Sequence, residues 1–229
     1  MKILAIGAHP DDIEIFMYGL LKLLKNNGNE IFLAIATDGA LGGDNSKEDL
    51  VEIRKKESLN GLKDLGIPYF FNFPDGHLGD DNKHKVLIKS YINDLKPSLL
   101  ITHHKKDYHS DHRILSNYVK NAAGHYIPIL NCETMMGLNF LPNYYVDITK
   151  FFENKKNAVL SHISQNPLRF IDLIKMMNGY RSAQCNSPLG TYTESYYFEN
   201  SFPFSDIKDL LPPSPPIKPF HIQNQNGFL

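Results

Sequence analysis

Apolar runs and amphipathic segments alternate along most of the chain. The runs at 2–7 (KILAIG), 30–37 (EIFLAIAT) and 98–102 (SLLIT) are short and almost continuously apolar, which is typical of strands buried in a parallel sheet. Between the first two runs, apolar residues recur at helical spacing over 13–25, and Gly28 suits the end of that helix. The same patterns predict further strands at 69–73, 127–130 and 144–148 and further helices at 50–65, 86–95, 111–122, 151–162 and 168–178.

This alternation predicts an α/β fold with a single Rossmann-like, doubly wound and mostly parallel sheet flanked by helices. The first strand, helix and strand form a βαβ unit, whose crossover we expect to be right-handed. A chain of 229 residues is long enough for one such domain and short for two separate cores. Ligands of these sheets bind beyond the carboxyl ends of the strands, so the candidate loops are 9–12, 38–49, 75–78 and 103–112.

The C-terminal segment has a different composition from the rest of the chain. We predict one domain over residues 1–200 and a Pro-rich tail over 201–229 that lies extended on the body or on a neighbouring subunit. Proline lacks the backbone N–H that a helix interior needs, so this density of proline excludes a helix. The prolines are Pro212, Pro213, Pro215, Pro216 and Pro219.

Charge and cysteine content limit the function classes. Lysine plus arginine (24) nearly balances aspartate plus glutamate (25), and the net charge of −1 does not favour a nucleic-acid partner. Cys132 and Cys185 lie far apart, so we expect no disulfide framework and a reducing, cytoplasmic setting. We expect no signal peptide and no membrane segment, because no apolar run approaches the ~18 residues that a transmembrane helix requires.

A polar turn follows the first predicted strand. It places His9 beside Asp11 and Asp12, where a nucleotide site would instead have glycines that let backbone amides approach phosphate. An imidazole with two carboxylates is suited to holding a cation or moving a proton. The alternative is that Asp11 or Asp12 only caps the following helix.

A second polar cluster follows the strand predicted at 98–102. Here His109 and His112 bracket Asp111, while the adjacent His103 and His104 could be ordinary surface residues. Both clusters fall on one edge of the predicted sheet. His9, Asp12 and His112 can therefore supply the three protein ligands of a catalytic zinc site, although such a set also accepts Fe(II), Mn(II) or Co(II).

The remaining polar groups of the two clusters have plausible catalytic roles. Asp11 could take a proton from an attacking water, and His109 could stabilise an oxyanion or protonate a leaving nitrogen. Asp111 could orient one of the histidines, as carboxylates near metal ligands often do.

Together these motifs resemble the LmbE/PIG-L family of zinc-dependent N-deacetylases. The segment 9–14 (HPDDIE) is similar to the family's AHPDD motif, and 109–112 (HSDH) to its HxDH motif. Supporting segments follow in the family's order up to about residue 200, namely 37–43, 52–57, 73–78, 146–149 and 162–165. Three sites depart from the family pattern: Tyr18-Gly19 replaces paired small residues, Ala40 replaces a frequent glutamate, and 192–196 only loosely matches YAE-x-F.

The resemblance implies roles for particular residues. His9, Asp12 and His112 would bind Zn²⁺, Asp11 would be the general base, and His109 the electrostatic stabiliser or general acid. Arg54 would reach the site as a substrate-binding group; the alternative is an ordinary exposed arginine on a helix. Asp38, in the loop that follows the second strand, is a further substrate-binding candidate, and Tyr192 either contacts the oxyanion or packs.

The resemblance also implies a reaction and a substrate class. The expected activity is removal of an N-acetyl group from an amino sugar or an amino-sugar conjugate, in a homo-oligomeric enzyme with a small-molecule substrate. Two alternatives stay open: another zinc amidase or esterase, and a non-catalytic metal- or sugar-binding module. The segment 131–145 could form a variable wall of the pocket or a subunit interface.

Overall fold

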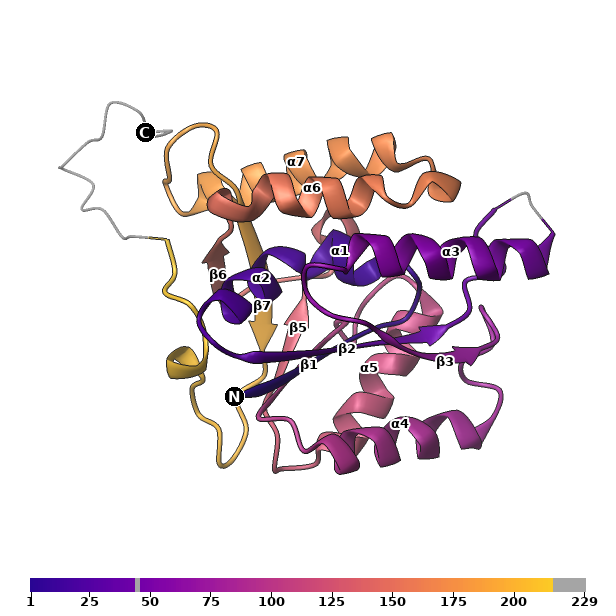
Figure 1. Ribbon diagram of the computed structural model, residues 1–229. Helices are drawn as coiled ribbons and strands as arrows, with labels where there is room; N and C mark the ends of the chain where they lie inside the picture. Colours follow the sequence, from indigo (N-terminus) through magenta and orange to yellow (C-terminus); the bar gives the residue numbers. More distant parts are fainter. Residues whose placement is uncertain (44–45, 216–229) are drawn as a thin grey trace.

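Within the described residues, seven strands form one mixed sheet at the centre of the protein (Figure 1). The computed structural model describes residues 1–43 and 46–215. The strand order is β3-β2-β1-β4-β5-β7-β6, with β1 to β5 parallel and β7 antiparallel to both of its neighbours. The strands are β1 (Lys2–Gly7), β2 (Glu30–Thr37), β3 (Tyr69–Phe73), β4 (Leu99–Thr102), β5 (Ile129–Cys132), β6 (Tyr144–Asp147) and β7 (Thr193–Phe198).

Helices cover both faces of the sheet, which confirms the predicted doubly wound α/β architecture. Figure 1 shows α4 and α5 below the sheet and the other helices above it. In β1, Ile3 and Ala5 pack into the core of one face, and Leu4 and Ile6 into the core of the other. The upper helices are α1 (Asp12–Phe16), α2 (Tyr18–Asn26), α3 (Lys47–Gly61), α6 (Phe152–Leu160) and α7 (Pro167–Gln184); the lower ones are α4 (Asn82–Leu95) and α5 (Ser110–Ala123).

The sequence-based prediction of one helix over 13–25 is wrong, because the helix is broken at Met17. Met17 has φ −130° and separates α1 from α2. The backbone amides of Gly19 and Leu20 instead donate to the buried carboxylate of Glu194, at 2.9 and 2.8 Å. An acceptor from β7 thus satisfies two N–H groups at the start of α2, which have no partner within the helix.

Strand β7 was absent from the prediction, although it lies between β5 and β6. Its sequence (TESYYF) carries polar side chains that are nevertheless buried, so it lacks the apolar pattern of a core strand. Glu194 also accepts hydrogen bonds from Lys155 Nζ and Tyr196 Oη, both at 2.7 Å. Burial of this carboxylate therefore depends on partners that come from α2, α6 and β7 itself.

Replacing Lys155 with methionine is expected to destabilise the protein by about 3–5 kcal/mol, because it leaves the Glu194 carboxylate buried without its counter-charge. The free energy of unfolding from urea denaturation measures this loss. Lys156→Met is the matched control, since Lys156 pairs with the exposed Glu153 and should change stability by less than about 1 kcal/mol. Equal effects of the two substitutions would contradict the prediction.

The described part of the C-terminal tail lies against the body of the protein. Ile207 is buried in the core that contains α2 and α6, and Asp206 accepts a hydrogen bond from Tyr144 of β6. A short 3₁₀ turn at Lys208–Leu210 ends just before Pro212. Pro216 and Pro219 lie outside the described residues, and the boundary at residue 200 stays a prediction.

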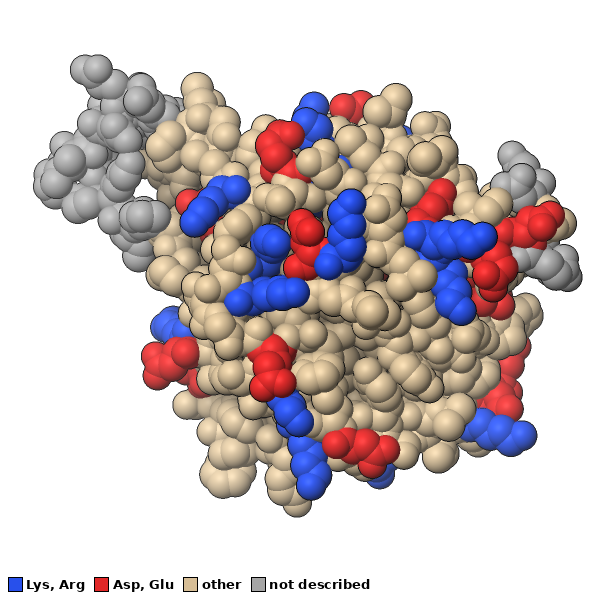
Figure 2. Space-filling model, in the orientation of Figure 1, with Lys and Arg blue, Asp and Glu red and all other residues tan. Residues whose placement is uncertain are grey.

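The expectations about partners and cellular setting depend on the surface charges and on the two cysteines. On the face drawn in Figure 2, acidic and basic side chains are interspersed, without a broad basic stripe. Cys132 and Cys185 are both free thiols. Among the described residues, no helix combines the length and the apolar character needed to cross a bilayer.

Candidate metal centre and active site

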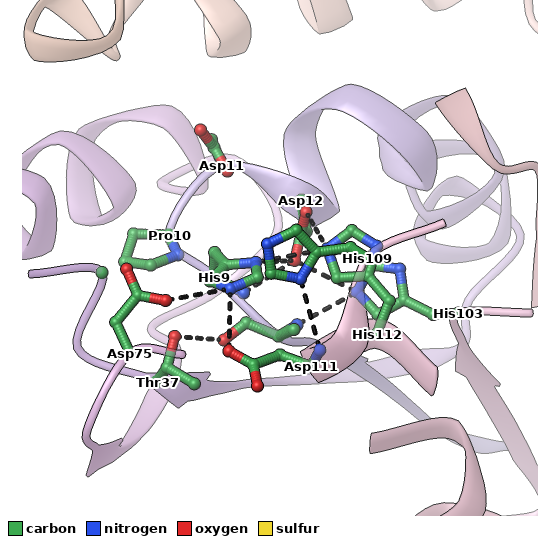
Figure 3. Close-up of polar contacts among 12 residues, drawn as sticks. His9, Pro10, Asp11, Asp12, Thr37, Asp75, His103, His109, Asp111 and His112 are labelled. Carbon is green, nitrogen blue, oxygen red and sulfur yellow. Dashed lines mark hydrogen bonds and ion pairs between the residues drawn. The ribbon is translucent and has the colours of Figure 1, made fainter. Parts of the chain in front are cut away.

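The loops that follow β1 and β4 meet at the point where the strand order reverses. These two parallel strands are neighbours in the sheet, while the chain continues from β1 to one side and from β4 to the other. Such a switch point leaves a crevice beyond the strand ends. The crevice brings His9 and Asp12, from the first loop and the start of α1, beside His109 and His112, at the start of α5 (Figure 3).

His9, Asp12 and His112 form a compact, buried triangle of possible ligands, in which Asp12 turns one carboxylate oxygen towards each histidine. His9 Nδ1 lies 3.2 Å from His112 Nε2 and 3.4 Å from Asp12 Oδ2, and His112 Nε2 lies 3.3 Å from Asp12 Oδ1. Tetrahedral zinc ligands at about 2.0–2.1 Å from the ion are separated from one another by about 3.3–3.4 Å. The spacing of the triangle therefore fits a small divalent metal ion.

Further possible ligands surround this triangle. Three overlapping sets each have ligand atoms within 4.8 Å of one another: His9 with His109 and His112, Asp12 with His103 and His112, and His9 with Asp75 and Asp111. Every set contains at least one member of the triangle. The triangle itself combines two imidazoles and a carboxylate, a donor set that suits zinc and several other first-row divalent metals.

The electrostatics of the cluster also favour a cation. Burial lowers the pKa of His112, but the neighbouring Asp12 and Asp107 carboxylates outweigh it and raise this pKa to about 9. Burial alone would raise the pKa of Asp12. The positive charges of His112 and His103 outweigh this effect and hold the pKa well below its usual range. The carboxylates that stabilise the protonated form of a histidine here would also stabilise a bound divalent cation, because both carry positive charge.

His103 and Asp107 also belong to the site, and the sequence analysis missed them. The interpretation of His103 as a surface residue is wrong: it is fully buried, its ring stacks on His112 with centroids 3.7 Å apart, and its Nε2 lies 3.1 Å from Asp12 Oδ2. His104, interpreted in the same way, is buried as well. Asp107 Oδ2 lies 3.1 Å from His112 Nδ1 and so can orient that ring. The sequence feature that could have identified His103 and Asp107 is their position shortly after β4, at the same sheet edge as His9.

Two carboxylates contact the other ring nitrogen of His9. Asp75 Oδ1 lies 3.2 Å and Asp111 Oδ2 3.4 Å from His9 Nε2, and Asp111 also accepts a hydrogen bond from the amide of Gly76 at 2.9 Å. Asp111 thus lies where an orienting carboxylate was expected. Asp75 lies in one of the predicted strand-end loops, but its side chain had been assigned no role.

Asp11 lines the same cleft as the triangle without contacting its ligand atoms, and its partner is Arg54. Figure 3 shows its carboxylate apart from the imidazoles. Arg54 Nη2 donates to Asp11 Oδ2 at 3.1 Å, and the guanidinium also donates to the carbonyls of Pro10 and Gly39. Arg54 is only 3% exposed, so the alternative of an ordinary exposed arginine is wrong.

The structure does not support the alternative that the Asp11 side chain caps the helix. Asp11 occupies the N-cap position of α1, yet its side chain makes no capping hydrogen bond among the described residues. Its φ of 121° is a costly backbone conformation for a residue with a Cβ, and such strain is concentrated at functional sites. Burial raises the pKa of Asp11, and the Arg54 charge offsets only part of that shift.

His109 lies at the N-terminus of α5, next to the triangle. Its Nδ1 accepts a hydrogen bond from the Asp111 amide at 3.3 Å, and its ring centroid lies 4.6 Å from that of His9. Burial, followed by the positive charges of His9 and His112, lowers the pKa of His109. With Nδ1 accepting, a neutral His109 carries its proton on Nε2, where it can be donated.

The structure does not bring Asp38 and Tyr192 to this cluster. Asp38 Oδ1 accepts hydrogen bonds from the amides of Ala40 and Asp75, so this carboxylate links two loops. The Tyr192 ring stacks on Phe152 with centroids 3.5 Å apart, which agrees with the packing alternative. Neither Asp38 nor Tyr192 is among the described residues that line the cleft over the triangle.

A cleft of about 350 Å³ opens over the triangle. From the segment 131–145, only Met135 is among the described residues that line it. Its polar lining comprises His9, Asp11, Asp12, Arg54, Asp75, His109, Ser110, His112, Gln165 and Arg169, and its apolar lining Ile15, Phe16, Leu41, Tyr108, Met135 and Phe170. A lining of mixed polar and apolar side chains suits a small polar molecule that carries an apolar group.

The fold and the site define a doubly wound α/β protein with a His/Asp metal-type cluster at its switch point. The family model described as PIG-L, GlcNAc-PI de-N-acetylase, matches residues 4–123, which include both motif clusters. The chain belongs to the PIG-L family.

Individual relatives agree with this assignment. The chain is 34% identical over 172 residues to the uncharacterized deacetylase YaiS of Escherichia coli K12, covering 71% of this chain and 90% of the relative. It is 28% identical over 188 residues to the diacetylchitobiose deacetylase of Thermococcus kodakarensis, covering 72% and 70%. Among solved structures, the 4-carboxy-2-hydroxymuconate hydratase GalB of Pseudomonas putida KT2440 superposes with a TM-score of 0.76, covering 86% of this chain and 95% of that one. At 17% identity, this last likeness shows a shared fold.

Proposed function

We propose that the protein is a metal-dependent N-deacetylase that hydrolyses the acetamide of an amino sugar or an amino-sugar conjugate. The observation that carries the proposal is the pairing of two groups in one cleft: a triangle of His9, Asp12 and His112 spaced for a metal ion, and a separate buried carboxylate, Asp11, held by Arg54. A site that only binds a metal has no need of the second group.

His9, Asp12 and His112 would hold the metal, and we propose zinc as the ion. When bound, a divalent ion of this kind polarises an acyl carbonyl and brings the pKa of a water ligand towards ~7. His103, Asp107, Asp75 and Asp111 would keep the ligand side chains in position through the contacts described above.

The other residues of the cleft would carry out the proton transfers. Asp11 accepts a proton from the attacking water, and Arg54 fixes the direction of its carboxylate. His109 donates a hydrogen bond to the developing oxyanion or a proton to the departing nitrogen. Water adds its oxygen to the acyl carbon as the C–N bond breaks, and the nitrogen gains a proton, so the products are a free amine and acetate.

The substrate class is inferred from relatives. One relative is named as a diacetylchitobiose deacetylase, and another, 28% identical over 185 residues, as a probable N-acetyl-alpha-D-glucosaminyl L-malate deacetylase from Bacillus cereus. Both names describe N-acetylated amino sugars linked to a second group. We propose the same class for this chain, with the sugar acetamide placed over the triangle.

Release of a primary amine from N-acetylglucosamine conjugates tests the proposal. Zinc-loaded protein should release stoichiometric amine and acetate, a chelator should stop the reaction, and added zinc should restore it. Hydrolysis of simple esters or unrelated amides with no action on N-acetyl sugars would favour the broader amidase or esterase alternative. Metal or sugar binding without any hydrolysis would favour a non-catalytic module.

A further inference from the structure

One charged side chain that lines the cleft forms no hydrogen bond or ion pair with the residues that the structure describes. Arg169, in the first turn of α7, borders the same cleft as the triangle. Among the interactions of residues 1–43 and 46–215, its guanidinium takes part in no hydrogen bond or ion pair. Arg54, the other arginine of the cleft, donates three hydrogen bonds to protein acceptors.

The acidic groups that line the cleft are already engaged. Asp11 pairs with Arg54, Asp75 contacts His9, and Asp12 lies between imidazoles. The nearest acidic residue along α7 is the exposed Asp172, three positions after Arg169, and the described interactions include no ion pair between the two. Among the described residues, the Arg169 guanidinium therefore has no ion-pair partner.

Packing limits where this guanidinium lies. It sits over the ring of Phe170, with Cζ 4.5 Å from the ring centroid, and the Phe170 side chain is buried and lines the same cleft. A cation over an aromatic face is held by the ring's negative potential. Part of the entropy cost of ordering the Arg169 side chain is thus met before a ligand binds.

We propose that Arg169 is a specificity-determining residue that recognises an anionic group, carboxylate or phosphate, attached to the N-acetylated sugar. This inference rests on the proposed function and narrows its substrate class to acidic amino-sugar conjugates. The planar guanidinium can bind either anion through two parallel hydrogen bonds. Arg169 lines the same cleft as the triangle but makes no described contact with its residues, so it can contact a part of the substrate other than the acetamide.

Three probes that share one sugar test the proposal: the methyl glycoside of N-acetylglucosamine, its carboxymethyl glycoside, and N-acetylglucosamine 1-phosphate. The wild-type protein should show a KM about tenfold lower for at least one anionic probe than for the neutral one, as expected for one charged hydrogen-bonded contact. The two anionic probes distinguish carboxylate from phosphate. Because the cleft is open to solvent, the preference should shrink as salt rises.

Substitution of Arg169 assigns the preference to this side chain. Arg169→Ala should raise KM about tenfold for the preferred anionic probe, leave KM for the methyl glycoside unchanged and leave kcat unchanged for both. Arg169→Lys should retain part of the preference. Lys175→Ala is the matched control, because Lys175 is an exposed cation on the same helix that does not line the cleft.

The outcomes separate the two proposals. Hydrolysis of the methyl glycoside supports the deacetylase function whatever Arg169 does. Equal KM values for all three probes, or a preference that survives Arg169→Ala, would overturn the role of Arg169 alone. If no probe is hydrolysed, calorimetric binding of the same three compounds still measures the anion preference, and equal affinities would again reject it.

Discussion

Asp11→Ala is expected to lower kcat by about 100-fold or more while the protein keeps its metal, since removal of a positioned general base costs about 10²–10⁴ in rate. Asp11 does not belong to the ligand triangle, and its carboxylate accepts a hydrogen bond from Arg54. Elemental analysis and steady-state turnover on the same purified sample measure the two properties together.

The control for Asp11→Ala is Asp11→Asn, which preserves side-chain volume and can still accept a hydrogen bond from Arg54. Both variants weaken the partner of a buried guanidinium, so thermal unfolding should be recorded to show that each is folded. Asp11→Asn should lose turnover to a similar degree with a smaller loss of stability. Near-normal turnover in a folded, metal-loaded sample of either variant would rule out Asp11 as the base.

His112→Ala is expected to weaken metal binding by more than about 100-fold, because loss of a direct ligand should exceed the 10–100-fold effect typical of groups that only orient one. His112 Nε2 lies within 3.3 Å of the ligand atoms of both His9 and Asp12, so its removal opens one corner of the triangle. Metal content after dialysis against a weak chelator measures this loss, and hydrolysis should disappear with the metal.

His125→Ala is the matched control for His112→Ala, since His125 is exposed and lies outside the cleft. It should retain metal and activity at the wild-type level. A His112→Ala protein that keeps one equivalent of tightly bound metal would show that a different set is responsible, such as His9 with Asp75 and Asp111.

The fold class was predictable from sequence because the buried parallel strands consist mostly of apolar residues. In β1 and β4, nearly every residue is buried on one face or the other, so the strands appear as apolar runs. Strand β7 lacks this apolar pattern. It can bury Glu194 because Lys155 and the backbone amides at the start of α2 donate hydrogen bonds to the carboxylate. Such compensation is invisible until distant segments are placed together in space.

The candidate site was predictable to a similar extent and for a similar reason. His9, Asp12 and His112 stand at strand ends, where the rule for parallel sheets brings side chains together. His103 stands at the same edge, but a histidine followed by another histidine and two lysines looks like a surface residue in sequence. Its burial arises from the stack on His112, which depends on the position of α5 relative to β4.

Because β7 lies between β5 and β6, this part of the sheet cannot form in the order in which the chain is synthesised. Residues 129–132 and 144–147 are made early, but they cannot take their final places until residues 193–198 arrive between them. A nascent chain on the ribosome thus carries two unpaired strand edges while some fifty further residues are being added, a span that includes α6 and α7. Nascent chains exposing such edges are prone to aggregate and are typical clients of chaperones.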